Sequence, residues 1–133
     1  MVMALLDDSI ERSSALVIDG NEVSRRTLVG MLRNFGVRRI DQVARPQDAR
    51  DSLEVRQFDI ILCDYHFIGE PINGQELMDD LRQSGLLPLE SVVVMISGEA
   101  DYSHVAEAAE VALDAYLLKP HTEEALRVRL AKA

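Results

Sequence analysis

The sequence holds one cysteine, Cys63, and no tryptophan, and aromatic residues make up only 5% of its 133 residues. A single cysteine excludes a disulfide framework within the chain and is typical of proteins kept in a reducing compartment, so we expect a cytoplasmic setting. Cys63 lies inside an apolar run, and we interpret it as a small core residue rather than a nucleophile.

Long apolar runs are also missing, since none approaches the roughly 20 residues needed to span a bilayer. The apolar residues 1–6 are followed directly by Asp7 and Asp8, and this is not the pattern of a secretory signal. Basic residues are scarce: 14 Lys+Arg against 23 Asp+Glu give a net charge of −9 at pH 7. The lack of long apolar runs leads us to expect a soluble protein with no membrane partner. Because non-specific binding to nucleic-acid phosphates needs basic side chains, the acidic charge leads us to expect no direct nucleic-acid partner.

A hydrophobic content of 47% suits one domain with one core. Segments of strand length occupy residues 15–18, 40–43, 58–64, 91–96 and 115–118, and all except 40–43 are mainly apolar. Apolar residues at helical spacing fill residues 21–36, 46–57, 75–83, 101–112 and 122–130. This alternation predicts a doubly wound α/β fold, a parallel sheet with helices on both faces. We divide the chain into an N-terminal extension, residues 1–13, and one domain, residues 14–133.

Polar residues end four of the predicted strands, namely Asp19, Asp64, Ser97 and Lys119. In a parallel sheet the carboxyl ends of the strands share one edge, where open α/β sheets bind their ligands. Two neighbouring carboxylates favour a hard cation such as Mg²⁺, while an ammonium and a hydroxyl suit a phosphoryl group. A carboxylate beside a metal can also attack phosphorus to form an acyl phosphate. The alternative is four unrelated strand-end residues, with Asp64 serving only as a turn residue.

Over residues 14–131 the chain resembles the receiver domain of two-component response regulators. The motifs that carry the resemblance are Val17-Ile18-Asp19, Cys63-Asp64-Tyr65, Asn73-Gly74, Ile96-Ser97-Gly98 and Tyr116-Leu117-Leu118-Lys119-Pro120. The resemblance implies a five-stranded, flavodoxin-like sheet of order 2-1-3-4-5. It also implies a phosphoprotein of phosphorelay signal transduction that switches the binding of an output domain or partner protein. Such a domain is not an enzyme, because it catalyses only its own phosphorylation and dephosphorylation. A phosphorylation-dependent dimer is compatible with this function.

The same resemblance assigns roles to individual residues. Asp64 would accept the phosphoryl group from a histidine kinase or a phosphotransfer protein, and would also bind Mg²⁺. Lys119 and Ser97 would contact the phosphoryl group. Ser97 and Tyr116 would form a switch, in which the aromatic residue follows the hydroxyl.

The metal site departs from the family at one position. Asp19 and the backbone carbonyl of His66 would be ligands together with the acceptor aspartate, but a second acid usually follows the first strand, and here that position is Gly20. A water, a movement of Asp19 into the position, Glu22 or Glu70 could replace the missing ligand, and the expected Mg²⁺ affinity is weak.

Gly20 keeps a second hypothesis open, a degenerate receiver that acts as a phosphate-independent interaction domain. A third hypothesis is a metal-dependent phosphohydrolase with an aspartyl nucleophile. That chemistry usually needs an acid/base aspartate two residues after the nucleophile. His66 follows Asp64 at this distance, and Asn21 follows Asp19, so the sequence favours this hypothesis least.

Overall fold

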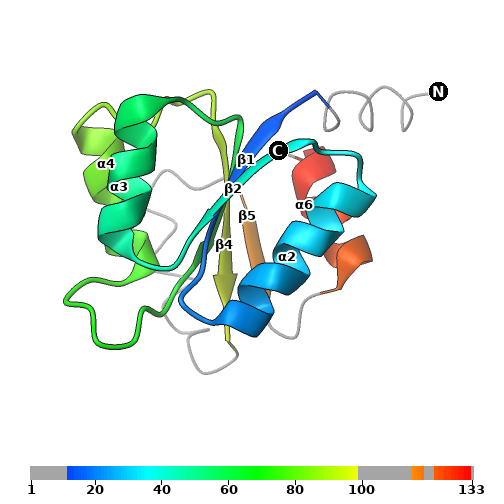
Figure 1. Ribbon diagram of the computed structural model, residues 1–133, viewed down its shortest axis with the longest axis horizontal. Helices are drawn as coiled ribbons and strands as arrows, with labels where there is room; N and C mark the ends of the chain where they lie inside the picture. Colours follow the sequence, from blue (N-terminus) through cyan, green and yellow to red (C-terminus); the bar gives the residue numbers. More distant parts are fainter. Residues whose placement is uncertain (1–11, 99–114, 119–121, 133) are drawn as a thin grey trace.

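The computed structural model describes residues 12–98, 115–118 and 122–132 (Figure 1). Its parallel sheet has the order β2-β1-β3-β4-β5. The strands are β1 (Ser14–Ile18), β2 (Arg39–Val43), β3 (Ile60–Asp64), β4 (Val92–Ser97) and β5 (Ala115–Leu118). The described helices are α2 (Glu22–Asn34), α3 (Pro46–Val55), α4 (Gly74–Gln83) and α6 (Glu123–Lys132).

The predicted α/β class with a parallel sheet is confirmed, and so is the order 2-1-3-4 for the four strands whose side chains are described. The backbone of β5 pairs with β4 at the far end of the sheet. Four helices are described, and the helix predicted over residues 101–112 lies outside the described residues.

Two hydrophobic clusters cover the two faces of the sheet. In β3, Ile60 and Leu62 belong to one cluster and Ile61 and Cys63 to the other, as the period of two in a strand requires. The first cluster contains apolar residues of α2 and α6, and the second those of α3 and α4. Figure 1 shows these two pairs of helices on opposite sides of the sheet. Because both faces are covered, the central strand is apolar without interruption.

Local signals fix both ends of α2. The side-chain oxygen of Asn21 accepts the backbone N–H of Ser24 at 2.9 Å and so caps the start of the helix. Gly36 follows the helix with φ of 97°, and the N–H of Val37 donates to the carbonyl of Leu32 at 3.0 Å. This is the pattern of a helix end that needs a left-handed residue. Within the described ranges, no helix is long and apolar enough to cross a membrane.

The central position of β3 leads to a stability prediction. Leu62 has no exposed surface, so Leu62→Ala removes buried methyl groups and leaves a cavity. We expect the free energy of unfolding to fall by about 2–5 kcal/mol. Leu89→Ala is the matched control, because Leu89 is 81% exposed, and its effect should stay within about 0.5 kcal/mol. Urea unfolding followed by circular dichroism measures both, and equal losses would contradict the assignment.

Candidate functional site

Two carboxylates come together at the carboxyl edge of the sheet. Ile18 of β1 pairs with Cys63 of β3, so Asp19 and Asp64 follow as neighbours at the ends of adjacent strands. Asp19 is fully buried and Asp64 is only 6% exposed. Neighbouring buried carboxylates disfavour each other's charge unless hydrogen-bond donors or a cation compensate. The two carboxylates can therefore contribute oxygen ligands to a cation.

The two carboxylate oxygens of Asp19 have different surroundings. Oδ1 accepts the backbone N–H of Asn21 at 2.9 Å, and Nη1 of Arg25 donates to the backbone carbonyl of Asp19 at 2.8 Å. These bonds hold Asp19 against the start of α2. Oδ2 is buried and accepts no hydrogen bond from any described residue. A buried carboxylate oxygen of this kind needs a donor, a water or a metal ion.

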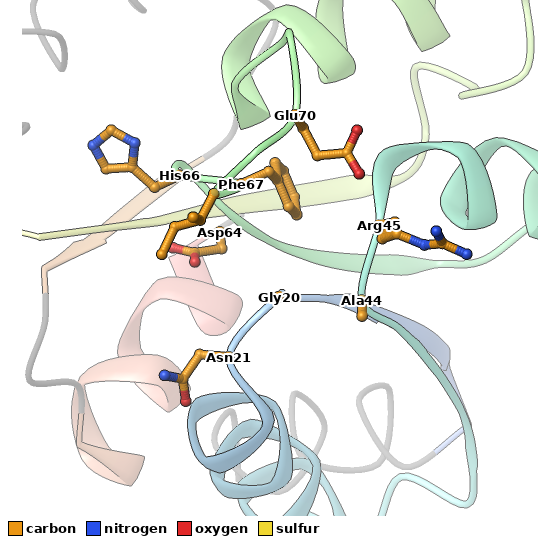
Figure 2. Close-up of a pocket in the computed structure, with 9 residues that line it drawn as sticks. Gly20, Asn21, Ala44, Arg45, Asp64, His66, Phe67 and Glu70 are labelled. Atoms are coloured by element: carbon orange, nitrogen blue, oxygen red, sulfur yellow. The ribbon is translucent and has the colours of Figure 1, made fainter.

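A pocket of about 410 Å³ opens beside Asp64 (Figure 2). It is lined by Gly20, Asn21, Ala44, Arg45, Asp64, His66, Phe67, Ile68 and Glu70. The imidazole of His66 is exposed and points away from the pocket in Figure 2. This leaves the backbone carbonyl of His66 as its candidate metal ligand, as the resemblance to the family implies. The side chain of Glu70 turns from the loop towards the pocket.

The backbone does not require a glycine at position 20. A Cβ atom there would meet only the carbonyl oxygen of Ala44, at an ordinary contact distance of 3.5 Å, and Gly20 has no positive φ. Of the two acids that could replace the missing ligand, only Glu70 lines the pocket. Glu22 is exposed on α2, where it forms an ion pair with Arg26 at 3.2 Å. The structure therefore separates two residues that the sequence left equivalent.

Gly74 allows α4 to pack directly on the backbone of the candidate acceptor. A Cβ atom at Gly74 would overlap with the carbonyl oxygen of Asp64 and would lie 3.0 Å from Sδ of Met95. The N–H of Gly74 also donates to the carbonyl of Tyr65 at 2.7 Å. The helix begins one residue earlier than predicted because Gly74 is its first residue and makes these close contacts. The Asn73-Gly74 motif thus has a steric cause.

Asn73 fixes the start of α4 relative to the end of β3. Its side-chain oxygen accepts the N–H of Glu76 at 2.8 Å, while its own N–H donates to Oε1 of Glu76 at 3.0 Å. This reciprocal pair is a capping box. The amide Nδ2 of Asn73 also donates to the hydroxyl of Tyr65 at 3.3 Å. The residue that follows Asp64 is therefore tied to the helix cap.

The remaining predicted site residues are Ser97, Tyr116 and Lys119, and they do not belong to β1 or β3. Ser97 ends β4 with 1% exposure, one residue after Ile96, which pairs with Asp64. The Ser97 hydroxyl donates to the carbonyl of the next residue at 3.2 Å. The backbone of Tyr116 lies in β5, next to β4. The side chain of Tyr116 and the whole of Lys119 fall outside the described part of the chain.

Cys63 lies directly before Asp64 but is not suited to nucleophilic chemistry. Burial raises the pKa of its thiol well above the ordinary value, and the nearby carboxylates of Asp64 and Asp19 raise it further. The thiol therefore stays protonated at neutral pH, and a protonated thiol is a poor nucleophile. This supports its interpretation as a core residue.

Arg45 joins the site in the folded protein, although no motif in the sequence pointed to it. It follows β2 by two residues and lines the same pocket as Glu70 (Figure 2). Its Nε forms an ion pair with Oδ2 of Asp48 at 3.4 Å. The rule that located Asp19 and Asp64 could have found it, because β2 ends at the same edge of the sheet.

Comparisons with known proteins agree on one family. The family model of the response regulator receiver domain matches residues 15–131. The chemotaxis protein CheY-3 of Vibrio cholerae serotype O1 is 27% identical over 117 residues, which cover 88% of each chain. The chemotaxis protein CheY of Pseudomonas aeruginosa is 26% identical over 117 residues, covering 88% of this chain and 92% of that one. The signal receiver domain of an HD domain-containing protein from Pseudomonas fluorescens has a similar fold, with a TM-score of 0.79 and 22% identity, covering 92% of this chain and 94% of that one.

The contact of Gly74 with β3 predicts opposite effects for two glycine substitutions. Gly74→Ala should destabilise the protein and displace Asp64, because the added methyl group overlaps with a backbone oxygen. Gly30→Ala in the middle of α2 is the matched control, since nothing lies within 4 Å of its added atom. We expect Gly30→Ala to stabilise the protein by about 0.4–1 kcal/mol. Urea unfolding of both variants checks this, and a neutral Gly74→Ala would contradict it.

Proposed function

Because this chain belongs to the family of response regulator receiver domains, we propose that Asp64 accepts a phosphoryl group from a histidine kinase or phosphotransfer protein. Phosphorylation then changes how the domain binds an output domain or partner. The observation that carries the proposal is the position of Asp64. It ends a strand whose residues are all buried, it is 6% exposed, and it lines the pocket at the sheet edge.

The transfer is a displacement at phosphorus. One carboxylate oxygen of Asp64 attacks the phosphorus of a phosphohistidine, and a new O–P bond forms as the P–N bond breaks. The electron pair of the broken bond stays on the imidazole nitrogen of the donor, which takes up a proton. The product is an acyl phosphate on Asp64. Subsequent hydrolysis restores the carboxylate, so the domain modifies only itself and has no turnover substrate.

The chemistry of the site fits a divalent cation. Asp19 and Asp64 supply carboxylate oxygens, one of which is buried without a donor among the described residues, and Mg²⁺ favours oxygen ligands completed by water. We propose Asp19, Asp64 and the backbone carbonyl of His66 as ligands. Bound Mg²⁺ would neutralise the charge that develops on the phosphoryl oxygens. Lys119 and the Ser97 hydroxyl are the proposed contacts of the phosphoryl group. The division at residues 13 and 14 and the cytoplasmic setting remain predictions.

Phosphate labelling tests the acceptor. Incubation with acetyl phosphate and Mg²⁺ should add one phosphoryl group to the chain, as measured by intact mass, and Asp64→Asn should abolish the gain because it removes the attacking oxygen. Asp51→Asn is the matched control, since Asp51 is exposed on α3, and it should label like the wild type. Borohydride reduction should map the label to Asp64. A folded wild-type protein that takes no label would instead favour the phosphate-independent receiver.

The switch rests on competition for the Ser97 hydroxyl. This group now donates to a neutral backbone carbonyl at 3.2 Å. A phosphoryl group on Asp64 offers a charged acceptor, and a charge-assisted hydrogen bond is roughly twice as strong as a neutral one. We propose that Ser97 turns towards the phosphoryl group and that Tyr116 moves into the space beside β4.

NMR shifts with and without beryllofluoride, a phosphoryl mimic, test the switch. We expect changes to extend from Ser97 through residue 118 in the wild type. In Ser97→Ala the changes should shrink to the immediate site, because no hydroxyl remains to move. Wild-type changes confined to the surroundings of residues 19, 64 and 119 would contradict the switch.

A further inference from the structure

We propose that the amino edge of the sheet holds a binding site for a small phosphate-bearing anion, formed by Arg12, Arg38 and Arg39. The inference goes beyond the proposed function, because the site lies where the strands begin and shares no residue with the pocket beside Asp64. The class of ligand that it assigns is a compact diphosphate, in which two phosphoryl groups are joined in one anion.

The three arginines line one pocket of about 600 Å³, together with Ser13 and Gly36. Ser14 of β1 pairs with Arg39 of β2, so the residues that lead into these two strands lie side by side. Figure 1 shows both strands beginning at the end of the sheet where α2 finishes. Three cationic side chains from two segments of the chain therefore line the same space.

No acidic residue lines this pocket in the part of the chain that the structure describes. The side chains of the three arginines form no salt bridge with a described residue, although Asp41 follows Arg39 by two residues in the same strand. Asp59, which precedes β3 at this edge, is engaged elsewhere: its Oδ2 accepts the N–H of Ser14 at 2.9 Å and the hydroxyl of Ser14 at 3.2 Å. An anion can therefore bind these arginines without first breaking an ion pair within the described chain.

The end of α2 does not require these arginines as a cap. A helix ends in carbonyl groups that carry partial negative charge and attract cations. Here the N–H groups of residues 35–37 already donate to the carbonyls of residues 31–33, at distances of 2.9–3.2 Å. Because backbone donors satisfy these carbonyls, the side chains of Arg38 and Arg39 remain available for a ligand.

The number and placement of the arginines favour phosphate over carboxylate. A guanidinium group binds the oxygens of either anion through two parallel N–H donors. A phosphate is tetrahedral, so its oxygens can accept from donors on several sides, whereas a planar carboxylate presents only two oxygens. A diphosphate carries more negative charge than a single phosphate and makes fuller use of three cations. No aromatic side chain lines the pocket among the described residues, so the site is not suited to stack on a base.

Calorimetric titration of the metal-free chain with sodium pyrophosphate, at low ionic strength where surface charges are least screened, tests the site. Pyrophosphate should bind more tightly than inorganic phosphate. Arg12→Gln, Arg38→Gln and Arg39→Gln should each weaken pyrophosphate binding by about 10-fold or more, the equivalent of one hydrogen bond to a charged group. Arg26→Gln is the matched control, since it removes the same charge from an exposed arginine that pairs with Glu22 on α2, and it should bind like the wild type. Equal weakening in all four variants would indicate a general charge effect and overturn the inference.

NMR shift mapping locates the bound anion. Pyrophosphate added to the metal-free chain should shift the amide signals of residues 12–14 and 36–39 and leave those of residues 19, 64 and 97 unchanged. Shifts centred on residues 19, 64 and 97 would place the anion at the opposite edge of the sheet and overturn the inference. Acetyl phosphate labelling is read separately by mass, so a chain that takes no label can still bind pyrophosphate, and the two proposals fail independently.

Two further anions test the class of ligand. Citrate supplies carboxylates without phosphorus and should bind more weakly than pyrophosphate, and equal binding would contradict the preference for phosphate. Adenosine diphosphate contains the same diphosphate attached to a nucleoside. It should bind no more tightly than pyrophosphate, because no described side chain of the pocket can stack on its base. Tighter binding of the nucleotide would show that the site recognises a nucleoside and would overturn the assignment of a compact anion.

Discussion

Both faces of β3 are covered by helices, and its side chains from Ile60 to Cys63 are buried in two separate clusters. A shift of the strand by one residue would turn each of these side chains to the opposite face of the sheet, away from the cluster in which it now packs. The pairing register of the strand is therefore strongly specified. The first polar side chain of the strand, Asp64, is therefore held at the edge of the sheet. The reactivity that we propose for this carboxylate depends on a hydrophobic constraint.

Contacts around Asp64 divide its surroundings into a rigid part and an adaptable part. Gly74 lets α4 approach the backbone of Asp64, and Asn73 ties the next residue, Tyr65, to the helix cap. These contacts hold Asp64 in place. A few residues on, the loop tip around Gly69 has little packing. A fixed carboxylate beside a loosely held loop suits the proposed site, which would orient that carboxylate and adapt to a cation and a phosphoryl group.

The glycine at position 20, where the family usually has an acid, matters because it changes the charge of the site. The chain carries a net charge of −9, and two of its carboxylates are buried side by side at the sheet edge. Oδ2 of Asp19 accepts no hydrogen bond from the described residues, so a cation at this edge would give that oxygen a partner. Glycine at position 20 lowers the negative charge of the site and leaves space beside Ala44.

The sequence by itself determined the features that depend on neighbours in the chain. Asn21 and Gly36 bound α2 because caps are local, and the apolar runs locate strands because buried strands exclude polar groups. The edge position of Asp19 and Asp64 also followed, because parallel strands end together. Only the tertiary structure decided that Glu70 and not Glu22 faces the pocket, that Arg45 joins it, and that Gly74 touches the backbone of Asp64. These features depend on the path of loops and the placement of helices, which long-range packing sets and which no local pattern encodes.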